Sequence, residues 1–196
     1  MIEFNFNTMG EEIIITLKTT MTQIGTFHKM VAVIYSLDWD ILSGDIRTVE
    51  EQGEQYSYDI IKLKKEGKKH PVELGLLMDT VFSNKSKLDE VIKSLNIQKV
   101  EPKKFFMGRK ELIFEDDQEK QATVFYIEAD NGKGLLYYVT KVLMDYKIDI
   151  KEAKIQTDPN TQTVMDTFYL TDEKGGLFGN LPIAEEIREQ ILKPLR

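Results

Sequence analysis

A short glycine-containing turn is the part of this sequence best suited to hold a small ligand. It stands directly before a segment with helical periodicity and reads Asn131-Gly132-Lys133-Gly134-Leu135-Leu136. The first backbone N–H groups of a helix lack intrahelical partners, and the helix dipole adds about half a positive charge there. A ligand carboxylate is therefore favoured at Gly134, Leu135 and Leu136.

Neighbouring groups could recognise the rest of an amino acid. Gly132 and Gly134 allow a ligand to approach the backbone closely and tolerate a positive φ. The Asn131 amide can donate or accept a hydrogen bond, and the Asp130 carboxylate can accept one from an ammonium group. Glycine pairs of this kind also form tight strand-to-helix connections, with Asn131 only stabilising the turn. The residues alone leave a ligand site and a purely structural turn both open.

The turn belongs to the second of two related segments, which are offset by 109 residues. Gly25-Thr48 and Gly134-Thr157 match mainly in their apolar positions, as a shared fold requires. The first copy offers a weaker second site at its own turn, formed by Thr22, Gln23, Gly25 and Thr26. Because Thr22 replaces the asparagine, this copy is alternatively a degenerate partner that supplies only a wall.

Both copies contain the same order of predicted elements. Each reads strand, helix, strand, hairpin turn, strand, helix, with helical apolar spacing in the first helices and short apolar runs in the strands. The predicted strands cover 13–17, 41–49 and 56–63 in the first copy, and 124–127, 148–157 and 163–171 in the second. The second helices place Leu74, Leu77, Met78 and Val81, or Ile183, Ile187 and Ile191, on one face.

This order predicts an α+β protein made of two ferredoxin-like (βαββαβ) units, with antiparallel sheets and helices on one face. The expected boundaries are residues 11–97 for the first unit, 98–120 for a linker and 121–196 for the second unit. The first unit carries an extra helix around Leu88, Val91, Ile92 and Leu95, and no final strand remains for the second unit. A strand at 111–115 joins one of the sheets, and the open edges favour pairing between copies or chains.

Several of these motifs together resemble the ACT domain family. They are the Asn131–Leu136 turn, an alanine-containing strand at 153–157, and the strand residues Asp166, Thr167 and Phe168. The arrangement is most similar to the tandem ACT pair at the C-terminal end of bacterial PII uridylyltransferases. The resemblance is good over residues 101–196 and weaker over 11–83. It implies small-molecule sensing, often of amino acids, at surfaces where two ACT units meet.

Composition restricts the class of protein further. The chain has 196 residues, a net charge of −7 and no cysteine, which excludes thiolate metal sites, disulfides and a cysteine nucleophile. With only His28 and His70, no metal site or other cofactor is expected. The acidic balance argues against nucleic acid, and no apolar stretch is long enough to cross a membrane. The polar start is unlike a signal peptide, so we expect a cytoplasmic protein.

Three further residues are expected to have structural roles. Trp39 is expected as a core or interface anchor. Asp40 and Asp149 recur before a strand and are expected to stabilise the turn, with ligand contact as the alternative.

We therefore expect no enzyme but a regulatory protein of two ACT domains, because the chain shows neither a nucleotidyltransferase signature nor a His-Asp dipeptide. It would bind an amino acid and signal through domain or subunit packing, in nitrogen metabolism by resemblance, as a homo-oligomer or with a protein partner. The alternative is a protein–protein interaction module that binds no ligand.

Overall fold

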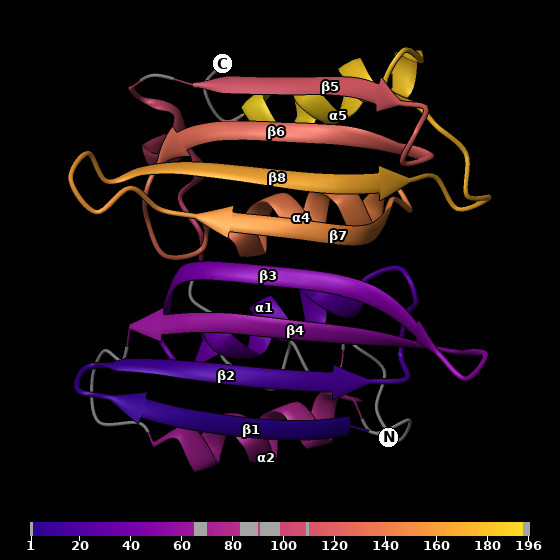
Figure 1. The fold of residues 1–196 in the computed structure, drawn as a ribbon. Helices are drawn as coiled ribbons and strands as arrows, with labels where there is room; N and C mark the ends of the chain where they lie inside the picture. Colours follow the sequence, from indigo (N-terminus) through magenta and orange to yellow (C-terminus); the bar gives the residue numbers. More distant parts are fainter. Residues whose placement is uncertain (1, 65–69, 83–89, 91–98, 109, 194–196) are drawn as a thin grey trace.

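The computed structural model describes residues 2–64, 70–82, 90, 99–108 and 110–193. Eight antiparallel strands form one continuous twisted sheet in the order β1-β2-β4-β3-β7-β8-β6-β5. The helices lie behind this sheet in Figure 1 and cover one of its faces. The predicted α+β class, the antiparallel pairing and the placement of helices on one face are therefore confirmed.

The first half of the chain contributes one side of the sheet and two described helices. Its elements are β1 (Ile2–Met9), β2 (Glu12–Thr19), α1 (Thr26–Ser36), β3 (Asp40–Glu51), β4 (Glu54–Lys64) and α2 (Pro71–Phe82). In β2 the isoleucines at 13 and 15 point into the core and are fully buried.

The second half repeats the same order after a short 3-10 helix, η1 (Pro102–Phe106). Its elements are β5 (Glu111–Asp117), β6 (Ala122–Asp130), α4 (Leu135–Asp145), β7 (Asp149–Gln156), β8 (Thr163–Thr171) and α5 (Pro182–Leu192). The helix α5 buries Ala184, Ile187 and Ile191. Each half thus reads β-β-α-β-β-α along the chain.

The strand that was expected to close each unit precedes it instead. β1 pairs along its whole length with β2, and β5 pairs with β6 in the same way. The edges that we expected to be open beside β2 and β6 are therefore covered from within each half. The segment 111–115, whose sheet the sequence did not determine, belongs to the second half. The extra helix expected at Leu88, Val91, Ile92 and Leu95 lies outside the described residues.

The two halves are joined through their inner strands rather than through their outer edges. β3 and β7 run antiparallel, with Asp45 opposite Lys154 and Arg47 opposite Glu152. Behind them α1 packs against α4. The pairing that we predicted between copies therefore exists, but it makes one sheet where the sequence predicted separate sheets.

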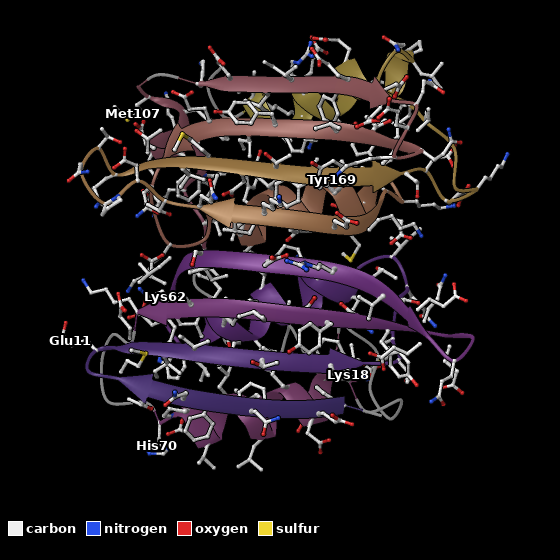
Figure 2. All side chains as sticks on the ribbon, in the orientation of Figure 1. Glu11, Lys18, Lys62, His70, Met107 and Tyr169 are labelled. Carbon is white, nitrogen blue, oxygen red and sulfur yellow. The ribbon has the colours of Figure 1, made fainter. Side chains whose placement is uncertain are left out.

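The face of the sheet that the helices leave open carries mostly polar and charged side chains. Figure 2 shows Lys18, Lys62 and Tyr169 on this face. Lys18 forms an ion pair with Glu51 at 2.8 Å, and the ammonium of Lys120 lies 3.8 Å from the centre of the Tyr169 ring. Among the described residues, no helix is long and apolar enough to span a membrane.

Candidate functional site: paired cavities between the two halves

A narrow cavity lies where the predicted turn of the second half meets the first half. The turn residues Asn131–Leu136 all line it. From the first half it receives the end of α1 and the start of β3, including Tyr35, Trp39, Asp40 and Ile41. The cavity has a volume of about 30 Å³, which is room for about two water molecules. Both halves are needed to form it.

The helix start at this cavity has the features that favour an anion. Gly134 stands at the N-cap of α4 in a left-handed conformation, with φ of 92°. The N-terminus has neither a side-chain cap nor an acidic residue in its first turn. The backbone N–H of Leu135 is turned back to the Gly132 carbonyl oxygen at 3.2 Å. The positive end of the helix dipole therefore remains without a negative partner among the side chains of this turn.

Two glycines of the turn are in close contact with aromatic rings. A Cβ atom on Gly132 would lie 2.9 Å from the ring of Phe105, and one on Gly134 would lie 3.0 Å from the ring of Tyr35. Asn131 is held by Gln162, whose backbone and side-chain oxygens accept bonds of 2.9 and 3.3 Å from its N–H groups. Lys133 forms an ion pair with Asp38 at 2.9 Å. These contacts fix the turn against both halves.

A buried carboxyl that we did not single out as a site residue also lines this cavity. Asp166 is fully buried on β8, and its Oδ1 accepts a bond of 3.0 Å from the backbone N–H of Gln156. Within the described part of the chain, its Oδ2 has no hydrogen-bond partner. Burial raises the pKa of Asp166 to about 8, and the bond from Gln156 only partly opposes this shift. The indole N–H of Trp39, in the same wall, likewise has no hydrogen-bond partner among the residues that the structure describes.

Asp130 lies apart from the other predicted site residues. It is not part of the cavity lining, and its Oδ2 accepts a bond of 2.9 Å from the backbone N–H of Gly108. The carboxylate that we expected to receive an ammonium group therefore stabilises the η1–β5 connection instead.

A second cavity lies at the equivalent turn of the first half. All four residues predicted for the weaker second site line it together with Asp149, and they are Thr22, Gln23, Gly25 and Thr26. Gly25 has φ of 87°, and a Cβ atom there would lie 3.0 Å from Met144 Sδ. This second cavity has a volume of about 20 Å³. Asp40 and Asp149 thus each line the cavity at the turn of the opposite half. From the sequence we had expected each of them to stabilise the turn before its own strand.

A second carboxyl, Asp59 on β4, is also buried, but it is not part of the lining of the second cavity. Asp59 lies opposite Ile46 in the β3–β4 register, and a backbone N–H bond from Arg47 reaches it. Asp166 stands in the corresponding place, because Ile155 and Gln156 are the counterparts of Ile46 and Arg47. The hydroxyl of Ser57, which lines this cavity, donates to Asp59 at 2.9 Å to Oδ1 and 3.0 Å to Oδ2. Burial raises the pKa of Asp59 to about 7.

The sequence contained a signal for both carboxyls. In β8 the inward-facing series is Val164, Asp166, Phe168 and Leu170, and in β4 it is Ser57, Asp59, Ile61 and Leu63. An aspartate in register with core residues on alternating positions must be buried, and a buried carboxyl without a paired charge is unusual. Across the described part of the chain, no three His, Asp or Glu side chains are grouped so that they could hold a metal ion.

Comparison with known proteins gives distant structural similarities. No family model matches the chain. The crystal structure of aspartate kinase from Synechocystis is similar over 93% of this chain and 27% of that chain, with 13% sequence identity and a TM-score of 0.48. An unknown protein from Galdieria sulphuraria is similar over 94% of this chain and 93% of that chain, with 11% identity and a TM-score of 0.29. This chain therefore spans about a quarter of the aspartate kinase that it resembles.

Proposed function

We propose that this chain is a non-catalytic regulatory protein that binds an amino acid in the cavity lined by Asn131–Leu136. The observation that carries the proposal is the shared cavity itself, because the α4 N-terminus of one half faces Tyr35, Trp39 and Asp40 of the other. The helix N-terminus suits the ligand carboxylate. The carboxyls of Asp40 and Asp166 suit its ammonium group. On the motif resemblance, we assign the chain to the tandem ACT proteins and to nitrogen metabolism.

The narrowness of the cavity supports a regulatory role. An amino acid needs more space than about two waters, so its entry must displace side chains such as Tyr35 or separate α1 from α4. A ligand shifts an equilibrium between packings only by the difference between its affinities for them. We propose that the open packing binds the amino acid and that a partner, or another copy of this chain, distinguishes the two packings.

A thermal-unfolding screen of the twenty amino acids tests this proposal. A ligand at one hundred times its dissociation constant adds about 2.7 kcal/mol to the free energy of unfolding. Asn131→Ala removes a side chain from the cavity, and Gln162→Ala removes its hydrogen-bond partner from outside the lining. We expect one amino acid to raise the melting temperature of the native protein and of Gln162→Ala, but not of Asn131→Ala.

The opposite results have clear meanings. If no amino acid raises the melting temperature, the proposal is wrong, and the ligand-free interaction module becomes the better explanation. If a ligand stabilises Asn131→Ala as strongly as the native protein, the binding site lies elsewhere.

A further inference from the structure

The two buried carboxyls differ in one neighbour and in their place, because Asp166 lines the cavity at Asn131–Leu136 whereas Asp59 is not part of the lining of the second cavity. Asp59 receives the hydroxyl of Ser57, whereas the position equivalent to Ser57 in β8 is Val164, whose side chain cannot donate a hydrogen bond. Asp166 consequently keeps an oxygen for which the described residues offer no donor, inside a cavity that it helps to line. Leaving a buried polar group unsatisfied costs about 1–3 kcal/mol, more for a charged group. A ligand that supplies the missing donor would recover this cost.

We propose that the cavity at Asn131–Leu136 recognises a protonated amine, whose N–H donates to Oδ2 of Asp166. The inference rests on the proposed function, since it assumes that this cavity is the ligand site. It assigns the selectivity for an amine over an uncharged or hydroxyl analogue to Asp166.

The charge of the site favours a cation over a neutral donor. A buried carboxylate is stable only with a counter-charge or with its proton retained. The described ionisable side chains that line the cavity with Asp166 are Tyr35 from α1, Asp40 from β3, Lys133 from the turn and Tyr137 from α4. Lys133 is paired with Asp38, and burial raises the pKa of both tyrosines above their usual value near 10. Asp40 adds a second carboxyl to the same cavity.

Binding of the amine should therefore release the proton that Asp166 holds. In the empty cavity, burial keeps this carboxyl protonated at neutral pH. The ammonium group stabilises the carboxylate form, so the proton leaves to solvent as the N–H···O bond forms. Affinity should rise as pH increases from 6 to 8, because less work is then needed to remove the proton.

The probe for the test is methylammonium chloride, whose two heavy atoms fit the narrow cavity. Tetramethylammonium chloride at the same concentration is the control, since it has the same charge and no N–H. We expect methylammonium, and not tetramethylammonium, to raise the melting temperature of the native protein, with a larger shift at pH 8 than at pH 6. Equal responses to both salts would overturn the proposal.

Substitutions at position 164 locate the effect. Val164→Ser introduces a hydroxyl at the place of Ser57, and Val164→Ala removes the same side-chain bulk without adding a donor. We expect Val164→Ala to keep the methylammonium response and Val164→Ser to lose most of it. If the two variants at 164 respond alike, Asp166 is not the receptor for the amine.

The outcome also separates this inference from the proposed function. An amino acid that binds Val164→Ser as well as Val164→Ala, while Asn131→Ala abolishes binding, leaves the ligand site in place and removes Asp166 from it. With a bound amino acid, calorimetry in two buffers of different ionisation enthalpy should detect release of about 0.9 proton at pH 7, as a group with a pKa of about 8 requires. Binding without proton release would contradict the inference and leave the proposed function standing.

Discussion

Gly134 lies directly against the ring of Tyr35, so that a Cβ atom on the glycine would be 3.0 Å from two ring carbons. The counterpart contact is made by Gly25, whose Cβ atom would lie 3.0 Å from Met144 Sδ. Tyr35 and Met144 occupy equivalent positions near the ends of α1 and α4. Each half therefore places a glycine at its helix N-terminus where the first helix of the other half ends.

Substituting Gly134 should cost more than its backbone conformation alone explains. Gly134→Ala combines a strained positive φ with crowding against Tyr35, and we expect a loss of about 2–3 kcal/mol of unfolding free energy. Gly53→Ala is the matched control, because its φ is +82° and nothing lies within 4 Å of the added Cβ. It should lose about 1 kcal/mol. Chemical denaturation measures both, and equal losses would show that the Tyr35 contact carries no energetic weight.

The buried carboxyl of Asp166 should make stability fall as pH rises. Its pKa is about 8 in the folded protein and about 3.9 in an unfolded chain, so between these values the folded state retains a proton that the unfolded state has lost. Stability from this group is thus greatest below pH 4 and decreases toward pH 8, by up to about 1.4 kcal/mol per pH unit. Asp59, with a pKa of about 7, adds a similar contribution that ends one unit lower.

Asp166→Asn removes this dependence. Urea unfolding between pH 5 and 8 should show a flatter profile for Asp166→Asn than for the native protein, with the variant relatively more stable at pH 8. Glu115→Gln, an exposed substitution on β5, should leave the native slope unchanged. Parallel profiles for the native protein and Asp166→Asn would mean that Asp166 is already ionised at pH 5.

The outer strand β5 should contribute substantially to the stability of the second half. The rings of Phe114 and Phe125 are stacked with centroids 4.3 Å apart, and Phe178 lies 6.0 Å from Phe114. Phe114→Ala should lower the unfolding free energy by about 3–5 kcal/mol, because it leaves a cavity in the core. Ile113→Ala, on the neighbouring and 39% exposed position, should cost about 1 kcal/mol or less. Similar losses at 113 and 114 would contradict the burial of the Phe114 side chain in the core.

A buried hydrogen bond links α1 of the first half to α4 of the second. His28 Nδ1 lies 2.9 Å from Thr140 Oγ1, whose own proton is donated to the Leu136 carbonyl oxygen, so the imidazole is the donor. Thr140→Val removes the acceptor of this buried hydrogen bond and should cost about 1–3 kcal/mol. Thr140→Ser keeps the hydroxyl and should cost less. Thermal unfolding of the two variants measures the difference, and a less stable Thr140→Ser would argue against this bond.

Periodicity predicted most of the fold because its strands and helices have one buried face. The β8 prediction at 163–171 agrees with the structure residue for residue, since alternating core side chains are bounded there by clear turn residues. The antiparallel α+β class follows from the same alternation. The repeat also located both turns, because glycine is required at the positive φ of Gly25 and Gly134.

The missed features depend on partners that no local pattern reveals. β1 alternates Ile2, Phe4 and Phe6 with polar residues, but among the described strands it pairs with β2 alone, and we predicted that the first unit begins only at residue 11. The place of Asp166 in the cavity arises from a meeting of β8 with α1 and the start of β3, which lie more than one hundred residues earlier. Asp130 illustrates the converse, because its adjacency to the turn suggested a ligand contact while the fold directs it to Gly108.

The charges along the junction between β3 and β7 determine which halves can pair. The register is symmetric about Asp45 and Lys154, so a half that paired with a copy of itself would set Asp45 against Asp45, or Lys154 against Lys154. Like charges directly opposite each other on neighbouring strands are destabilising, whereas Asp45 opposite Lys154 and Arg47 opposite Glu152 are complementary. Self-association of identical halves is thereby disfavoured, and the tandem chain always brings an unlike partner to its own inner strand.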